Sequence, residues 1–407
     1  TAFWASLIVG IVLTIAGITS ANPVSRIFKE PQLVLVIQSL SPIFLFSSLN
    51  NVQQAILQRN FAFKVIAFRS LIGTFAGGVT GISMAYFGMG VWSLVGQQLV
   101  QEFVGMCVLW QASSWRPRFR FSLRCLKDLF DFGISIIGFY VLNFLSSRAD
   151  NLLIGFFLGP TTLGYYNIAY RILETMNQVL INGISQVLLP VFAQFQENTL
   201  RLQQVYFGAI QMTSTIITPI FILVLVLAPE LISTLFGSQW LPSASILQVL
   251  SLAGIVRCLN YFKGSIFMAM GKPEWRFYFG LMAATINTSG FLIAVNYGVT
   301  AVACVHLIQP VVLFPLIHKK ICYLIQAKFN TYLSKIIHPF YASVVMLIVA
   351  IFSKVTLSEF LDSSILLVSS CGAISIISYI LLVRIFSPKV FQQMLEIAQY
   401  YSLVKNN

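Results

Sequence analysis

A row of polar and charged side chains runs through the otherwise apolar segment 163–195. Asn167, Arg171, Glu174, Gln178 and Asn182 recur at intervals of three or four residues, which places them on one face of a helix. Arginine suits phosphate because its guanidinium can donate paired hydrogen bonds. The stripe therefore predicts a hydrated cavity beside this helix, where Arg171 binds an anionic group such as phosphate.

Simpler explanations of the stripe remain open from the sequence. Arg171 and Glu174 are three residues apart and could neutralise each other on the helix surface. Amide side chains can also join neighbouring helices by hydrogen bonds. The length of the stripe, together with charges on other apolar segments, favours the cavity.

Charged residues also interrupt other apolar segments. A charge at the centre of a bilayer costs at least about 2.5–3.5 kcal/mol, so such side chains usually face a cavity or a partner. Basic residues outnumber acidic ones inside these segments, which favours an anionic ligand. Arg148 and Arg257 are further candidates for binding it, whereas Asp150, Glu174 and Glu102 are candidates for coupling to a proton or a cation.

Histidine and cysteine do not suggest a metal or a cofactor. The six cysteines and three histidines are dispersed and form no CxxC pair, so neither a metal site nor a cofactor is predicted. His306 lies in an apolar segment close to Pro310. We interpret it as a hydrogen-bonded structural residue in preference to a proton relay.

The composition requires lipid as the main solvent. Of the 407 residues, 57% are hydrophobic and 9% charged, with a mean hydropathy of +0.85, whereas soluble proteins carry about 25% charged residues. The formal net charge of +13 sits in short runs between apolar segments, as membrane topology demands. Membrane lipid is therefore an expected partner, and nucleic acid is not.

Apolar stretches long enough to span a bilayer recur along the chain, since a spanning helix needs about 20 residues. We predict an all-α polytopic bundle of about twelve helices, with no soluble domain. Short glycine-containing turns at 87–90 and 296–298 indicate helical hairpins. The helices are predicted at 1–21, 32–56, 65–87, 91–112, 128–158, 163–195, 205–228, 243–270, 277–297, 298–318, 336–353 and 362–385.

The distribution of lysine and arginine between alternate loops predicts the orientation. Most basic loop residues fall in one set of loops, and the opposite set holds only Arg26, Lys29 and Lys354. By the positive-inside rule the first set is cytoplasmic, so both ends of the chain are expected in the cytoplasm. The most basic loop, 115–127, is predicted to link two lobes.

Several segments together resemble the polysaccharide transporter family, the lipopolysaccharide and O-antigen flippases of the multidrug/oligosaccharidyl-lipid/polysaccharide flippase superfamily. Their order and spacing carry the resemblance, which runs from the first residue to about Gly271. The segments are TAFWASLIVG, NVQQAILQRNFAF, FGMGVWSLVGQQLVQ, WRPRFRFS, NFLSSRADNLLIGFFLGPTTLGYYNIAYRI and LLPVFAQFQ.

The resemblance implies two pseudo-symmetric lobes around a central cavity and the export of undecaprenyl-diphosphate-linked oligosaccharide from the bacterial cytoplasm by alternating access. It implies 14 helices, so we expect an N-terminally truncated member. Residues 1–114 would be the remainder of the first lobe and 115–127 the cytoplasmic linker. Residues 128–318 would form the six-helix second lobe, and 319–407 two further helices and a cytoplasmic tail.

A narrower similarity concerns the murein lipid II flippases. Their second-lobe helix carries Tyr-Ala-Asp-Arg-Leu followed by Leu-Leu-Pro, and here Ala169-Tyr170-Arg171-Ile172 precedes Leu188-Leu189-Pro190. The resemblance would make Arg171 the arginine that contacts the diphosphate. Tyr170 stands where that family has aspartate. Roles for Arg148, Asp150 and Arg257 are inferred from their position in apolar segments and are not carried over.

Three functions are compatible with a protein of this kind. The first is a flippase for lipid-linked oligosaccharide, with other polysaccharide assembly proteins as partners. The second is a multidrug or metabolite antiporter of the same fold, which would need acidic and aromatic groups to bind cations. The third, a membrane-embedded glycan polymerase or ligase, would need an extracytoplasmic loop with catalytic groups, but the longest such segment, 228–243, has Glu230 as its only charge.

Overall fold

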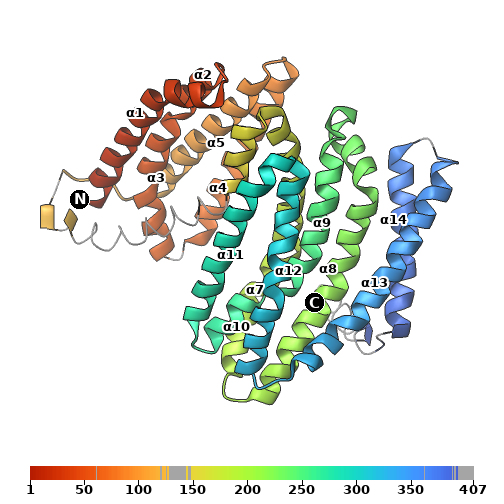
Figure 1. Cartoon of the computed structure of the whole chain (residues 1–407). Coiled ribbons are helices and arrows are strands. Elements are labelled where there is room, and N and C mark those ends of the chain that lie inside the picture. The colour runs from red at the N-terminus through yellow and green to blue at the C-terminus, as the bar shows by residue number, and fades with distance from the viewer. Residues whose placement is uncertain are drawn as a thin grey trace, which may run out of the picture. The chain divides into compact units, whose positions relative to one another are not determined.

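The computed structural model describes residues 1–60, 62–119, 122–124, 126–127, 144, 148–361, 363–386, 388 and 391–392, without the side chains of Phe63, 181–187, 335–336 and 338–339. Every regular element in these residues is a helix (Figure 1). The chain divides into two compact units, residues 1–144 and 145–407. The all-α prediction is therefore confirmed for the part of the chain described.

The first unit begins with α1 (Ala2–Phe28), α2 (Leu33–Leu40) and α3 (Pro42–Arg59). The sequence predicted one helix over 32–56, with Pro42 inside it. The structure instead ends α2 before Ser41 and starts α3 at Pro42. Proline lacks a backbone N–H and suits the first position of a helix better than its interior, so the break falls there.

The most extensive packing in the first unit joins α4 (Phe63–Tyr86) and α5 (Val91–Ala112), the hairpin predicted from its glycine turn. Gly88 and Gly90 in that turn have positive φ angles of 74° and 54°, which glycine adopts without strain. On α4, Gly77 lies against α5 so closely that a Cβ there would come within 2.7 Å of the Gln97 carbonyl oxygen.

The second unit contains a helical segment at 148–157, followed by eight α-helices. The helix predicted over 128–158 lies mostly outside the described residues. The one predicted over 243–270 is divided in two, with a turn at 260–262. The elements are α7 (Pro160–Gln194), α8 (Thr199–Phe236), α9 (Ser243–Leu259), α10 (Lys263–Ala269), α11 (Pro273–Ala294), α12 (Val299–Leu324), α13 (Phe329–Ser358) and α14 (Ser364–Phe386).

The core of the second unit forms around α8 and α9. Helix α8 packs against α9, α13 and α14, and α9 also packs against α7 and α12. Tyr166, Leu173, Phe221 and Leu250 are fully buried where these helices meet, together with Phe291 of α11. The aromatic and aliphatic packing fixes α7, α9 and α12 against one another, and these helices carry the polar groups described below.

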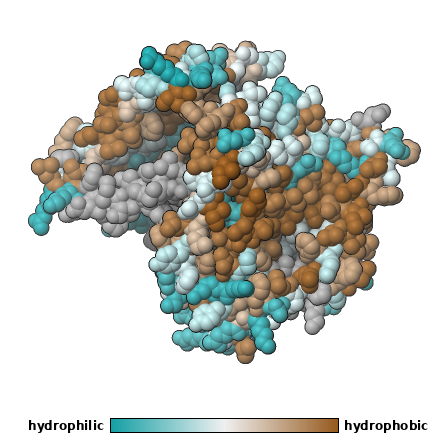
Figure 2. Space-filling model, viewed as in Figure 1, coloured by the Kyte–Doolittle hydropathy of each residue, from teal (hydrophilic) through white to brown (hydrophobic). Residues whose placement is uncertain are grey.

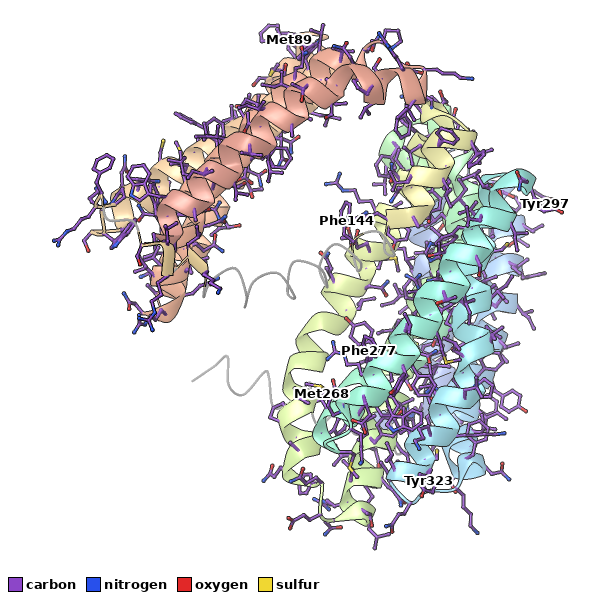
Figure 3. The ribbon with its side chains drawn as sticks, turned by 60° about the vertical axis from the view of Figure 1, so that its left-hand side comes forward. Met89, Phe144, Met268, Phe277, Tyr297 and Tyr323 are labelled. Atoms are coloured by element: carbon purple, nitrogen blue, oxygen red, sulfur yellow. The ribbon has the colours of Figure 1, made fainter. Side chains whose placement is uncertain are left out.

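Nine helical stretches among the described residues are long and apolar enough to cross a membrane. Helices α5 and α7 are not among these nine. Apolar surface covers the flanks of the helices of the second unit, and hydrophilic residues gather at their lower end (Figure 2). Tyr297 and Tyr323 lie exposed near opposite ends of α12 (Figure 3), as expected for an aromatic belt at the two bilayer surfaces. The chain is a multi-pass membrane protein.

Candidate functional site

The polar stripe of α7 borders a cavity of about 580 Å³ in the second unit. Gly159, with a φ of 85°, and Pro160 at the first helical position start α7, and the following apolar positions hold its buried face in the core. The stripe is left on the accessible side of the helix. The cavity is lined by Arg148, Asn167, Tyr170, Arg171, Glu174, Thr175 and Gln178.

Five predicted site residues therefore meet at one cavity: Arg148, Asn167, Arg171, Glu174 and Gln178. Asn182 was also predicted to bind substrate, but its side chain lies outside the described residues. Thr175 and Tyr170 complete the lining. Two guanidinium groups and one carboxylate give the cavity a cationic excess, which suits an anionic ligand.

The charges at this cavity are not paired off. Within the described residues, neither Arg148, Arg171 nor Glu174 takes part in an ion pair or a side-chain hydrogen bond. The alternative that Arg171 and Glu174 neutralise each other is wrong for this part of the structure. Their donors and acceptors are free to bind a ligand or water.

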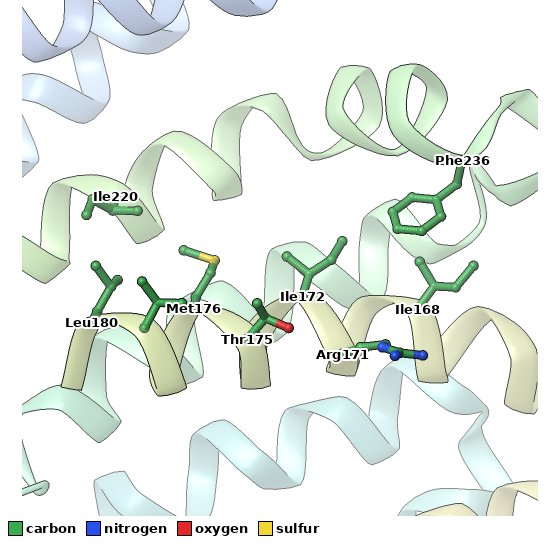
Figure 4. A pocket seen from close by; sticks show the side chains of 9 residues that line it. Ile168, Arg171, Ile172, Thr175, Met176, Leu180, Ile220 and Phe236 are labelled. Carbon is green, nitrogen blue, oxygen red and sulfur yellow. The ribbon is translucent and has the colours of Figure 1, made fainter. Parts of the chain in front are cut away.

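An apolar cavity of about 600 Å³ lies on the adjoining side of α7, between α7 and α8. Ile168, Ile172 and Leu180 of α7 face Ile220 and Phe236 of α8, with Arg171 and Thr175 beside them (Figure 4). Arg171 and Thr175 line both cavities. The guanidinium of Arg171 is thus at the boundary between a polar and an apolar compartment.

A second polar cluster is buried where the segment 148–157 meets α7, α9 and α12. The Tyr166 hydroxyl lies 2.5 Å from Asp150 Oδ2 and 2.9 Å from His306 Nε2, and His306 Nε2 lies 3.1 Å from the same carboxylate oxygen. Arg257 Nη2 lies 2.6 Å from His306 Nδ1. Asp150 and His306 are 1% and 5% exposed and Arg257 is half-buried, so the four side chains form one largely buried hydrogen-bonded network.

The structure thus separates residues that the sequence placed in one site. Arg257 contacts His306 and does not line the polar cavity, and Asp150 belongs to the same buried network. The prediction that His306 is hydrogen-bonded is confirmed at both ring nitrogens. Sequence analysis did not identify Tyr166 as a site residue. Its spacing of four residues from Tyr170, which places both tyrosines on one side of α7, was the one signal in the sequence.

Tyr170 connects the two clusters. Its ring lines the polar cavity, stacks on Tyr166 with centroids 5.7 Å apart and lies 5.6 Å from the ring of His306. This tyrosine, where the murein lipid II flippases have aspartate, is the closest described link between the cavity and the buried network.

Glu102, the remaining predicted site residue, lies in the first unit on α5. Its carboxylate is 3.5 Å from the guanidinium of Arg69 on α4, and Arg69 also donates a hydrogen bond of 3.1 Å to Gln54 of α3. Both ionic side chains are about one-fifth exposed. This arrangement neutralises two charges within the packed helices of the first unit.

Fold and site define a helical multi-pass membrane protein with an unpaired cationic cavity. Comparison with known sequences identifies the family to which it belongs. The profile of the family described as "Polysaccharide biosynthesis protein" matches residues 1–245. The chain belongs to this family, as the resemblance of its segments implied.

Two curated relatives illustrate the range of the family. The chain is 27% identical over 361 residues to the teichuronic acid biosynthesis protein TuaB of Bacillus subtilis (strain 168), covering 86% of this chain and 73% of that protein. It is 28% identical over 301 residues to the succinoglycan biosynthesis transport protein ExoT of Rhizobium meliloti (strain 1021), covering 73% of this chain and 59% of that protein.

Solved structures show the same fold. The lipid II flippase MurJ in an inward closed conformation aligns with a TM-score of 0.76 at 14% identity, covering 95% of this chain and 83% of that one. An inward-facing multidrug transporter of the MATE family and MOP superfamily aligns with a TM-score of 0.57 at 17% identity, covering 79% and 80%. The predicted superfamily fold is confirmed, and at these identities the likeness concerns the fold alone.

Proposed function

We propose that the chain is a flippase that moves a polyprenyl-diphosphate-linked oligosaccharide across the bacterial cytoplasmic membrane by alternating access. The observation that carries the proposal is the cavity on α7, where Arg148 and Arg171 have no internal counter-ion among the described residues. A charge near the membrane centre is costly unless it serves a ligand or a hydrated path. An undecaprenyl diphosphate headgroup supplies the missing anion.

The five lining residues that the sequence predicted each have a role in this proposal. Arg171 and Arg148 bind the diphosphate through paired hydrogen bonds, and Asn167 and Gln178 bind the polar glycan beside it. Asn182, whose side chain lies outside the described residues, stays a sequence-based candidate for the same role. Glu174 faces the cavity as an acceptor for sugar hydroxyls or as part of the ion coupling, for which Asp150 in the buried network is the stronger candidate. Glu102, paired with Arg69, has no free charge for that purpose.

The relatives support the substrate class. ExoT is named as a transport protein of succinoglycan biosynthesis and TuaB as a protein of teichuronic acid biosynthesis, and MurJ as a lipid II flippase. On this basis the glycan joins a surface polysaccharide pathway, with other assembly proteins as partners. Both ends of the chain lie in the cytoplasm by the positive-inside rule.

The second candidate is a multidrug or metabolite antiporter, and the fold shared with a MATE transporter supports it. Such a protein binds cations, for which Glu174 is the one carboxylate at the polar cavity. The two unpaired arginines beside it favour the flippase. Neither candidate is an enzyme, and we assign no catalytic residue and no cofactor.

The test is export of surface glycan in a strain that lacks its own flippase. The gene is expressed from its full reading frame as wild type, Arg171→Ala and Arg171→Lys, and lipid-linked oligosaccharide retained on the inner leaflet is quantified. Wild type should restore export, and Arg171→Ala should trap the intermediate at an unchanged protein level. Arg171→Lys, which keeps the charge without the paired donors, should be intermediate.

Arg384 provides a matched control, since it is an exposed arginine in the last turn of α14. Arg384→Ala should export like wild type. Normal export by Arg171→Ala would contradict the role of this side chain. Failure of wild type with several different glycans, together with drug efflux, would favour the antiporter.

A further inference from the structure

The contacts of the buried network define where its protons lie. Arginine is always a donor, so Nδ1 of His306, 2.6 Å from Arg257 Nη2, must be the acceptor and carry no proton. In neutral imidazole the other nitrogen then carries the hydrogen. Nε2–H donates to Asp150 Oδ2 at 3.1 Å, and the Tyr166 hydroxyl donates to the same oxygen at 2.5 Å.

Both oxygens of the Asp150 carboxylate accept hydrogen bonds within the network. Its Oδ1 accepts a hydrogen bond of 2.8 Å from the Asn151 backbone N–H, and its Oδ2 accepts from Tyr166 and His306. The described residues contain no group of three or more His, Cys, Asp or Glu side chains that could bind a metal. The Nδ1 lone pair of His306, which accepts the hydrogen bond from Arg257, is the one position where the neutral imidazole can take up a proton.

We propose that His306 is a proton-binding site and that a proton bound at Nδ1 takes the place of the hydrogen bond from Arg257. The proton occupies the Nδ1 lone pair, so the Arg257 N–H···Nδ1 bond breaks while the Nε2–H···Asp150 bond stays. The resulting imidazolium pairs with the Asp150 carboxylate. Neutral His306 thus ties α9 to α12, and protonated His306 releases Arg257 from α12.

Charged and polar groups from several packed elements surround His306. The segment 148–157 contributes the Asp150 carboxylate, which favours the proton, and α9 contributes Arg257, which opposes it. Helix α7 contributes the hydroxyl of Tyr166 and the ring of Tyr170, and α11 contributes the uncharged ring of Phe291, 5.0 Å away. Lys263 of α10 adds positive charge within range of Arg257. Release of Arg257 removes the nearest repulsive charge when the proton arrives.

The released guanidinium needs another acceptor, and this step rests on the proposed function. The diphosphate of the substrate supplies one, with Tyr170 bridging the network and the polar cavity. An anion that binds Arg257 also leaves Nδ1 free for a proton. Because linkage is reciprocal, diphosphate binding and His306 protonation should strengthen each other in this conformation.

Nuclear magnetic resonance of the full chain, with histidine labelled with nitrogen-15, tests the exchange without any substrate. His306 is assigned by its loss in His306→Gln, and its two ring nitrogens are followed between pH 8 and 5. Nδ1 should be unprotonated at high pH and gain a proton as the pH falls. Arg257→Met should tighten proton binding at least about tenfold, because it removes a like charge and a competing donor.

His318 on the same helix is the matched control. Its ring nitrogens contact the backbone carbonyls of Phe314 and Leu259, so Arg257→Met should leave its signal unchanged. The proposal is overturned if His306 keeps one protonation state from pH 8 to 5 in wild type and in Arg257→Met. It is also overturned if the substitution does not change the proton affinity of His306.

Farnesyl diphosphate, as a short prenyl diphosphate, tests the linkage. Between pH 8 and pH 6, the affinity of wild type and of His318→Gln for this ligand should rise about tenfold more than the affinity of His306→Gln. Protonation of the ligand itself affects all three proteins equally. An equal pH dependence in all three overturns the linkage. Absence of binding at any pH would count against the proposed function, while the resonance experiment still decides the exchange.

Discussion

Arg171 and Glu174 lie one turn apart on α7 and line the same cavity, yet no ion pair joins them in the part of the chain that the structure describes. Opposite charges at this spacing commonly pair on helix surfaces, where they contribute about 0.2–0.5 kcal/mol. Here both side chains extend into the cavity. The arrangement leaves a cation and an anion available to separate parts of a polar ligand.

We first predict that the two side chains are energetically independent. Arg171→Ala, Glu174→Gln and the double variant should form a cycle whose coupling free energy of unfolding is below about 0.3–0.5 kcal/mol, the additivity expected of residues without a shared contact. The measurement is unfolding of the purified chain in mixed micelles. A coupling above about 1 kcal/mol would show that the two charges do pair in the membrane.

The second prediction concerns the close approach of α4 and α5. Gly77→Ala should lower the unfolding free energy by about 1–3 kcal/mol, because overpacking forces a backbone to shift. A Cβ at Gly77 would lie 2.7 Å from the Gln97 carbonyl oxygen and 2.8 Å from Gln101 Cβ. The measurement is the same micellar unfolding.

The adjacent Gly78 is the control for that substitution. No atom lies within 4 Å of a Cβ placed there, and alanine favours a helix over glycine by about 1 kcal/mol. Gly78→Ala should therefore be neutral or stabilising. Equal effects of the two substitutions would mean that helix propensity, and not the contact with α5, dominates at Gly77.

Periodicity within one helix could predict the polar cavity but not the buried network. The stripe from Asn167 to Gln178 repeats at helical spacing, so one sequence segment contains most of the cavity lining. The His306–Asp150 and His306–Tyr166 contacts join residues 156 and 140 positions apart. No periodicity within a helix encodes which side chains of α7, α9 and α12 face one another, because packing of the core sets that.

The helices themselves were predictable from apolar length, and their interruptions were less so. The predicted segment 91–112 coincides with α5 (Val91–Ala112), although its glutamines lower its hydropathy. The turns at Ser41 and at 260–262 were not predicted, because a short turn with apolar neighbours leaves the hydropathy of a segment unchanged. Leu33–Arg59 and Ser243–Ala269 are nevertheless each one candidate membrane span, as predicted. The assignment of residues 115–127 as the linker between lobes stays a prediction.

A third prediction separates Glu102 from ion coupling. Because Glu102 pairs with Arg69 within the first unit, Glu102→Gln should reduce the unfolding free energy by about 1–3 kcal/mol, the range for hydrogen bonds to charged groups and for an unpaired partner. Glycan export per folded molecule should depend on the proton gradient in the same way as in wild type. The measurements are micellar unfolding and export normalised to folded protein.

The charge-swapped pair Arg69→Glu with Glu102→Arg provides the control for this interpretation. Restored attraction should recover part of the unfolding free energy that either single substitution loses. The recovery is incomplete because the swap removes the hydrogen bond that Arg69 donates to Gln54. A swapped variant that folds but whose glycan export no longer depends on the proton gradient would show that Glu102 takes part in ion coupling.

The last prediction concerns an ion pair that ties α13 to α8. Lys354 Nζ lies 2.9 Å from Glu230 and donates a further hydrogen bond of 2.9 Å to the Val226 carbonyl oxygen. The side chains are 26% and 19% exposed, so solvent screens the pair only in part. A double-mutant cycle of Lys354→Met and Glu230→Gln should give a coupling free energy of about 1–2 kcal/mol, within the range for residues in one ionic network.

Lys272 and Glu274 offer an internal comparison for that cycle. They are 3.9 Å apart and about half exposed, and exposed pairs of this kind contribute roughly 0.2–1 kcal/mol at most and weaken with salt. The Lys354–Glu230 coupling should exceed the Lys272–Glu274 coupling at low salt and fall less when salt is raised. Equal couplings would mean that Lys354 is solvated in the membrane protein and does not hold α13 against α8.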